Sequence, residues 1–298
     1  MSISRQNLTV VIVTFKSEHV IHDCIQSIPD KVEIIVVDNS NDKKFKESLE
    51  KRYHNVRCIL SSKNLGMGAG NNLGLKNVET DFALILNPDV TLEKDAIDEI
   101  MLSLDHLSNF SLLAPISNSK RYPNYKIDKK MGHSYNEKKP FKVKSIDGFA
   151  MFFNLKKINK YQTFSDSGYF DENIFMYLEN DDLCKRLIDI GEDIFIVPTS
   201  KINHLGAQAV NKKFKEEIEL SRNWHWIWSK FYFNKKHFGF FPAIIDGLPT
   251  LISALIKYFF YSILLNKRKK NIYRNRVSGF VNSLLGKKSW YRPNLDQY

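Results

Sequence analysis

The tripeptide Asn87-Pro88-Asp89 places a carboxamide and a carboxylate where they could bind a ligand. It closes the apolar run 82–86, which has the length and composition of a buried strand. Because proline cannot continue a central strand, the chain turns there. Ligands of open α/β sheets bind at the carboxyl ends of strands, and a carboxylate there can hold a divalent cation against a diphosphate. Taken alone, the tripeptide is more typical of an ordinary turn that ends a strand.

Two β-branched runs precede this tripeptide, at residues 9–15 and 32–40, and each ends in polar residues. The stretch 18–28 between them has the apolar spacing of a helix. A strand, a helix and a second strand form a βαβ unit, which predicts a parallel sheet with a right-handed crossover. Asp38 then lies at the carboxyl end of the second strand, where it is suited to hydrogen-bond a base or a ribose.

A glycine-rich segment follows a third predicted strand, residues 56–60. Gly66, Gly68, Gly70 and Gly74 fall within nine residues, so the backbone could approach a ligand closely before a helix begins near Gly70. The spacing matches neither the phosphate-binding loop that ends in Gly-Lys-Ser/Thr nor the dinucleotide fingerprint. The segment is therefore informative only together with its neighbours.

These segments, in this order, resemble the donor half of a family 2 glycosyltransferase, an inverting enzyme of the GT-A fold. Asn-Pro-Asp in place of Asp-x-Asp is similar to the rhamnosyltransferase-like branch, which decorates bacterial cell surfaces. The resemblance covers roughly residues 8–210. It is carried by Val-Thr-Phe at 13–15, Val-Val-Asp-Asn-Ser at 36–40, the stretch 63–74, Leu-Asn-Pro-Asp at 86–89, and the later stretches 147–153, 168–186 and 204–206.

The resemblance implies an α/β, mostly parallel GT-A sheet and a site for a nucleoside-diphosphate sugar. It implies that Asp89 binds Mg²⁺ or Mn²⁺, and that His204, which alone would be an ordinary surface histidine, is a second metal or diphosphate ligand. Asp147 and Gly148 would lie on the acceptor side. The residues implied for donor binding are Thr14, Phe15, Asp38, Asn64, Gly66, Asn71, Asn87 and Asp89.

The general base is where the sequence departs from its relatives. The family pattern is Glu-Asp-x-Asp-Leu-Cys, but the register here places Asn180 at the first Asp, and an asparagine cannot accept a proton. We rank Glu179 first as the base and Asp182 second, because Asp181 is best explained as a first-turn acid that opposes the helix dipole. The departure leaves open weak activity, a water-relayed proton or a catalytically inactive copy.

The C-terminal segment differs from this core in charge. Residues 221–298 hold 14 Lys and Arg against two acids, so the whole positive excess of the chain lies there. Aromatic residues crowd positions 224–241. Residues 244–264 have the spacing of an amphipathic helix, and Lys267-Arg268-Lys269-Lys270 follows. We expect an interfacial helix with a polybasic anchor on an anionic membrane. A protein interface, including a homo-oligomer, stays open, whereas nucleic acid and a membrane span are disfavoured.

The expected organisation is a GT-A domain at 1–215 and a helical membrane-association segment at 216–298. Residues 117–144 are expected to form a loop near the acceptor side. Cys24, Cys58 and Cys184 are scattered, which favours free thiols in a reducing cytosol, and we expect no signal peptide. The enzyme would then work at the inner face of the cell membrane.

The expected activity is inverting transfer of rhamnose or another hexose to a growing, lipid-linked surface glycan. The alternative is a non-catalytic membrane scaffold that keeps the fold, and Asn180 motivates it. A nucleotidyltransferase is disfavoured, because Thr14-Phe15-Lys16-Ser17 lacks a glycine- and lysine/arginine-rich signature after the first strand.

Overall fold

The computed structural model describes residues 7–107, 109–119, 123–127, 138–206 and 208–295. The chain forms two compact units. The first unit combines residues up to Asp171 with Asn180–Asn211, and the second combines Glu172–Glu179 with the chain from Lys212 onward. The sequence placed this boundary at residue 215 and assigned 172–179 to the enzyme domain.

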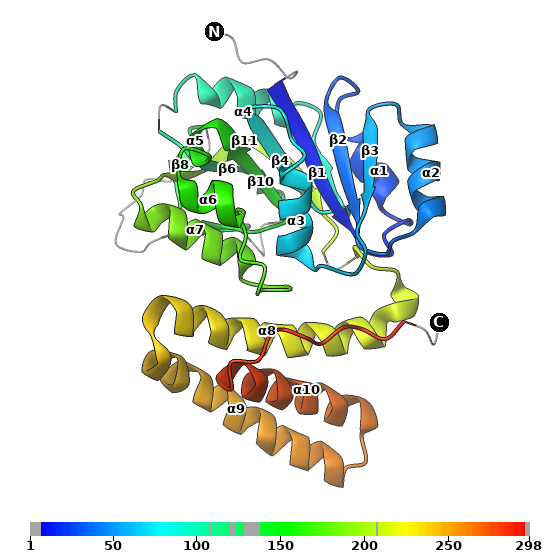
Figure 1. Ribbon diagram of the computed structural model, residues 1–298, viewed down its shortest axis with the longest axis vertical. Coiled ribbons are helices and arrows are strands. Elements are labelled where there is room, and N and C mark those ends of the chain that lie inside the picture. The colour runs from blue at the N-terminus through cyan, green and yellow to red at the C-terminus, as the bar shows by residue number, and fades with distance from the viewer. Residues whose placement is uncertain (1–6, 108, 120–122, 128–137, 207, 296–298) are drawn as a thin grey trace. The chain divides into compact units, whose positions relative to one another are not determined.

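The first unit is built on a nine-stranded sheet in the order β3-β2-β1-β4-β10-β6-β11-β5, with β8 paired to β11 (Figure 1). β10 is antiparallel to its neighbours β4 and β6, whereas β1 to β4 and the pair β6 and β11 are parallel. The mostly parallel sheet is therefore confirmed. The strands are β1 (Leu8–Thr14), β2 (Glu33–Asp38), β3 (Val56–Leu60), β4 (Phe82–Leu86), β5 (Val90–Leu92), β6 (Leu112–Ser117), β8 (Phe141–Lys142), β10 (Ala150–Asn154) and β11 (Ile194–His204); β7 (Tyr125–Lys126) and β9 (Ser145–Ile146) form a separate pair.

Helices cover both faces of this sheet. One apolar cluster includes side chains from α1, α2 and α4, and a second includes side chains from α3, α5 and α7. Central strands are thus buried on both faces, which explains why their sequences are continuous apolar runs. The helices are α1 (Ile21–Gln26), α2 (Lys43–Arg52), α3 (Met67–Leu75), α4 (Ala96–Leu104), α5 (Leu155–Ile158), α6 (Gln162–Ser167) and α7 (Glu179–Asp189).

Several elements differ from the sequence-based expectation, and one difference is that the expected loop 117–144 contains the short strands β7 and β8. α3 begins at Met67, three residues earlier than expected, because Gly66 adopts φ 85 and makes the turn into the helix. β11 continues to His204 rather than ending near Val197, since a register shift between Val197 and Lys201 accommodates Pro198. Of the expected loop 117–144, residues 120–122 and 128–137 lie outside the described residues.

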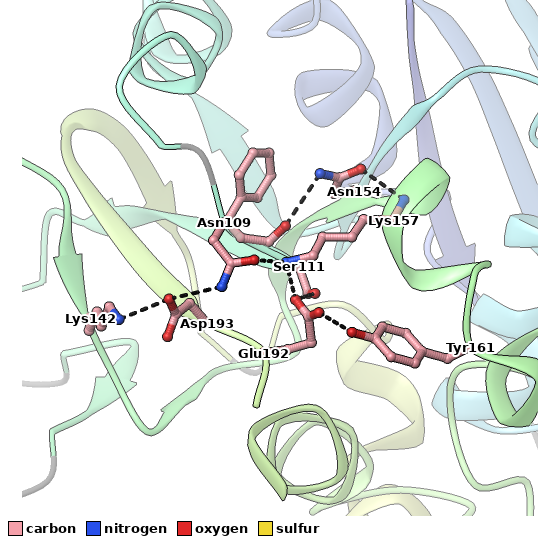
Figure 2. Close-up of polar contacts among 9 residues, drawn as sticks. Asn109, Ser111, Lys142, Asn154, Lys157, Tyr161, Glu192 and Asp193 are labelled. Atoms are coloured by element: carbon pink, nitrogen blue, oxygen red, sulfur yellow. Dashed lines mark hydrogen bonds and ion pairs between the residues drawn. The ribbon is translucent and has the colours of Figure 1, made fainter. Parts of the chain in front are cut away.

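A buried polar cluster holds the edge of the sheet where β6 and β11 begin (Figure 2). Glu192, just before β11, accepts hydrogen bonds from Ser111 and Tyr161 and pairs with Lys157. Burial alone would raise the pKa of Glu192, but these partners lower it below its ordinary value. The cluster ties the turn after α7 to the starts of the strands.

The second unit contains a short 3₁₀ turn at Lys212–Phe214 and three long helices, α8 (Lys215–Phe238), α9 (Phe240–Ile263) and α10 (Lys267–Leu284) (Figure 1). Trp224, Trp228 and Phe231 of α8 are buried among them. These aromatic rings therefore form a core, and they are not available to stack on nucleic-acid bases or to rest at a membrane interface.

The segment Glu172–Glu179 packs within this second unit. The Ser229 hydroxyl donates to the carbonyl of Met176 at 2.8 Å, and the Ser289 hydroxyl donates to the carbonyl of Asn173 at 2.9 Å. The guanidinium of Arg292 lies 3.7 Å from the ring centre of Phe175. Helices and tail residues far along the chain thus hold the segment that leads into α7.

Candidate active site

The carboxyl ends of the parallel strands share one edge of the sheet. Thr14, Asp38, Asn87 and His204 end or follow β1, β2, β4 and β11, which run in one direction. β10 runs the other way, so the residues before it, 147–149, reach the same edge. The fold therefore gathers these sequence-predicted residues at the edge where ligands of open α/β sheets bind.

The Asn-Pro-Asp turn and His204 form the centre of this edge. Asp89 Oδ1 lies 3.5 Å from His204 Nε2, and Asp89 Oδ2 accepts a hydrogen bond from the backbone N–H of Gln208 at 3.0 Å. The backbone carbonyl of Asp89 accepts from Leu205 N–H, which joins the turn to the end of β11. Asp89 is nearly fully buried, while the side chain of His204 is partly exposed.

These groups fit a divalent cation. Asp89 Oδ1 and Asn87 Oδ1 are buried and make no hydrogen bond within the described part of the chain. Burial alone would raise the pKa of Asp89, but the adjacent His204 ring and the hydrogen bond from the Gln208 N–H lower it, so the carboxylate is ionised. No cluster of three His, Cys, Asp or Glu occurs among the described residues. Asp89 and His204 could thus hold a cation that takes its other ligands from phosphate and water.

Phe149 and Gln208 support this pair, and the sequence did not single them out. The ring of Phe149 lies 4.1 Å from that of His204, and its carbonyl accepts the Asn87 N–H at 2.9 Å. The backbone of Gln208 serves Asp89, as described above. The position of Phe149 in the stretch 147–153 was a usable signal, whereas nothing in the sequence pointed to Gln208.

Asp38 organises the loops that follow β1 and β2. Its carboxylate accepts hydrogen bonds from the Thr14 hydroxyl and from the N–H groups of Ser40 and Asp42. The next residue of the first loop, Phe15, donates its N–H to the Ser17 hydroxyl. Asp38 is buried, and its hydrogen bonds hold the loops after β1 and β2 in place at the carboxyl edge of the sheet.

Asn39 holds the glycine-rich segment in place through hydrogen bonds, and the sequence analysis did not predict this role. Asn39 donates to the carbonyl of Gly66 at 3.0 Å and accepts from Leu65 N–H and from the Ser61 hydroxyl. Asn64 accepts the N–H of Gly66, which completes the turn.

The helix that follows lies directly on the sheet. A Cβ on Gly74 would stand 2.3 Å from a methyl carbon of Val11, so only glycine allows this approach. Asn71 of the same helix is buried, and its Oδ1 has no partner among the described residues. It is therefore placed to bind a ligand with that oxygen.

A charged cluster lies near Asp147 and Gly148, the residues that we expect on the acceptor side. Lys126 Nζ lies 2.8 Å from both oxygens of Asp181, and Ser145 donates to the same carboxylate at 2.5 Å. Burial raises the pKa of Asp147, Lys126 opposes that rise, and Asp181 adds to it. Gly148 follows in the turn before β10. Asp147 is thus a carboxyl group whose surroundings favour its holding a proton.

The start of α7 separates the two predicted bases. Asp182 is fully buried in an ion pair with Arg186 Nε at 2.8 Å. This pair indicates a structural role for Asp182 and argues against Asp182 as the general base. Asn180 donates to the carbonyl of Ile146 at 2.8 Å. Glu179 is the first residue of α7 and is buried. Tyr177 and Leu178 before it both have positive φ, a strained backbone of the kind that clusters at functional sites.

Proteins of known function include one similar sequence. The low-salt glycan biosynthesis hexosyltransferase Agl10 of Haloferax volcanii is 27% identical over 206 residues, which are 62% of this chain and 64% of that protein. The match thus spans less than two thirds of the relative's length.

Solved structures share the fold at low sequence identity. The mannosyltransferase PcManGT of Pyrobaculum calidifontis, solved with GDP-Man and Mn²⁺, matches with a TM-score of 0.55 at 12% identity over 95% of this chain and 88% of its own. S. aureus TarS 1–349 matches at 0.51 and 14% identity, over 96% and 93%. GalNAc-T7 with UDP, GalNAc and Mn²⁺ matches at 0.53 and 14% identity, over 73% and 50%. They establish a GT-A fold.

The family model for glycosyl transferase family 2 matches residues 9–162. This range contains most of β1, the glycine-rich segment and the Asn-Pro-Asp turn, whereas His204 and Gln208 lie beyond it. The chain belongs to glycosyl transferase family 2.

Proposed function

We propose that this protein is a metal-dependent, inverting hexosyltransferase that moves a sugar from a nucleoside diphosphate to a growing glycan. The observation that carries the proposal is the ionised, buried Asp89 beside His204 at the carboxyl edge of the sheet. The hexosyltransferase relative and the neighbours solved with nucleotide sugar and Mn²⁺ support it. Rhamnose remains one candidate sugar, and a lipid-linked surface glycan remains the proposed acceptor.

Each part of the edge has a role in this reaction. The loops fixed by Asp38 and Asn39 enclose the nucleotide, and Asn71 and Asn87 offer oxygens to the donor. Asp89 and His204 would hold Mg²⁺ or Mn²⁺, which when bound offsets the negative charge that develops on the departing diphosphate.

A base must remove the proton of the acceptor hydroxyl as its oxygen bonds to the anomeric carbon and the bond to the diphosphate breaks. We propose Glu179 for this role, since Asp182 is held by Arg186. Asp147 is the second candidate, because a carboxyl group with a raised pKa is better matched to proton transfer near neutral pH.

The test is a transfer assay with purified protein, a panel of UDP-, GDP- and dTDP-sugars, and Mn²⁺ or Mg²⁺. We expect one donor to be consumed, and no turnover in Asp89→Asn or after chelation of the metal. A folded protein that binds no donor and turns none over would instead favour the non-catalytic scaffold that Asn180 motivates.

A further inference from the structure

One side of α9 carries a continuous stripe of exposed apolar side chains, which we call the α9 stripe. Ile245 is 74% exposed and Ile263 is 81% exposed, although both are large and apolar. Members of the stripe recur every three or four residues, so they share one side of the helix. They are Phe241, Ile245, Leu248, Ile252, Ile256, Phe259 and Ile263. A contiguous apolar surface of this kind marks an interaction site.

The side of α9 opposite the stripe packs within its own unit. Ala243, Gly247 and Ala254 are buried, and a Cβ on Gly247 would stand 2.5 Å from the ring of Phe280 on α10. Asp246 pairs with Lys230 of α8 at 2.8 Å. α9 is therefore packed against α8 and α10 on one side and exposed on the side of the stripe.

This packing argues against a membrane span. Within the described residues, α9 is the one helix long and apolar enough to cross a bilayer, and 17% of its most apolar window is buried. A spanning α9 would have to leave its partners or draw them into the hydrocarbon. Drawing α10 into the hydrocarbon would be too costly, because α10 carries six basic residues: Lys267, Arg268, Lys269, Lys270, Arg274 and Arg276.

Basic residues stand at both ends of the α9 stripe. Lys235 and Lys236 lie in the last turn of α8, directly before α9. At the other end the exposed Leu264 and Leu265 lead into Lys267–Lys270 of α10. The chain from residue 221 carries 14 basic residues against two acids. An apolar strip between two clusters of positive charge complements a surface that is apolar inside and anionic outside.

We propose that the α9 stripe docks this protein on an anionic lipid surface, with α9 in the plane of the interface and its flanking lysines at the headgroups. Apolar insertion and electrostatic attraction would act together, as stable anchoring requires. Because the cytoplasmic leaflet carries the anionic lipids, this places the protein at the inner face of the membrane. A second copy is a poorer occupant, because a dimer through the stripe would bring two strongly basic tails together.

The test is flotation of the full-length protein with phosphatidylcholine vesicles that contain or lack phosphatidylglycerol. We expect flotation with anionic vesicles only, and weaker flotation as salt rises. Ile252→Gln/Ile256→Gln should weaken partitioning by about tenfold or more, since both side chains would enter the acyl boundary. The matched control is Leu102→Gln/Ile190→Gln, whose side chains, 62% and 46% exposed against 48% and 63%, lie outside the second unit.

A second pair of variants tests the charges. Lys267→Gln/Lys269→Gln should weaken partitioning about 30-fold, because each basic residue near anionic lipid contributes about 1 kcal/mol. Lys43→Gln/Lys44→Gln removes the same charge from exposed positions of α2 and should leave flotation unchanged. All four variants should keep the unfolding transition of the parent.

Three results would overturn the proposal: equal recovery with neutral and anionic vesicles, equal losses in test and control variants, or no flotation at all. A concentration-dependent dimer that Ile252→Gln/Ile256→Gln dissolves, without flotation, would assign the stripe to a second copy. Flotation is measured without a sugar donor. A negative flotation result would therefore contradict the docking of the α9 stripe without bearing on the proposed transferase activity.

Discussion

His204 Nε2 lies 3.5 Å from Asp89 Oδ1, and the two residues are neighbours in the sheet because Asp89 directly precedes Val90 of β5, which pairs with His204 of β11. The ring of Phe149 packs against His204 and the N–H of Gln208 holds the second oxygen of Asp89. The pair is thus fixed before any ligand arrives, which lowers the cost of ordering a metal and a diphosphate.

Asp89→Asn should weaken metal-dependent binding of a nucleoside diphosphate by about 100-fold or more, because a buried charge that faces the cation is lost. His204→Gln should weaken it less, since the carboxylate remains. Calorimetric titration with and without Mn²⁺ measures both. Unchanged affinity in Asp89→Asn would show that the metal binds elsewhere.

Glu179→Gln should lower turnover by about 10²–10⁴-fold while the donor affinity is retained, because a general base acts on the acceptor in the transition state. Asp147→Asn and Asp182→Asn are the comparisons. If Asp147→Asn alone gives this signature and removes the acidic limb of the pH profile, Asp147 is the base. Loss of folding in Asp182→Asn is expected from its buried pair with Arg186.

Gly74→Ala should destabilise the first unit by about 1–3 kcal/mol, because its Cβ would overlap Val11 at 2.3 Å. The gain in helix propensity from glycine to alanine, about 1 kcal/mol, is too small to reverse the sign. The Val11→Ala/Gly74→Ala double variant should recover part of the loss, as urea midpoints would reveal. Additive losses in the double variant would argue that the two residues do not touch.

The second unit should lose stability in acid through His225. This histidine is fully buried, and burial lowers its pKa to about 3, while its Nε2 lies 2.8 Å from the carbonyl of Tyr291. The unfolded chain takes up a proton near pH 6.5 and the folded unit does not. The contribution of neutral His225 to the free energy of unfolding is therefore complete above pH 6.5. It is lost as the pH falls toward 3, by at most about 1.4 kcal/mol per pH unit.

The measurement is the fluorescence-monitored unfolding of the parent and of His225→Gln between pH 7 and 4, with the buried Trp224 and Trp228 as reporters. The difference between the two curves isolates the histidine from the carboxylates, which both proteins share. Parallel pH dependences would mean that His225 is protonated in the folded state.

The positions of Asp38 and Asp89 at or just after the ends of strands could be predicted from the sequence. Asp38 and Asp89 stand at or just after the ends of apolar runs, so the pattern of buried strands is enough to place them at the edge of the sheet. Phe149 and Gln208 reach the site through pairings and loops across the sheet, for which no local pattern exists. The ion pair of Asp182 and Arg186 was predictable, because residues four apart in a helix face each other. That spacing is a reason in the sequence itself to prefer a structural role for Asp182 over the role of general base.

The membership of Glu172–Glu179 in the second unit could not be predicted either, since its partners are remote in sequence. Asn173 and Ser289, which share a hydrogen bond, are 116 positions apart. A ribosome adds about 5–20 residues per second, so roughly 6–23 s separate the synthesis of the two. The second unit, which contains both residues, therefore cannot be completed while its segment Glu172–Glu179 emerges. The segment Glu172–Glu179 must wait for α8 and for Ser289 before it can make these hydrogen bonds, so its native contacts form late in synthesis.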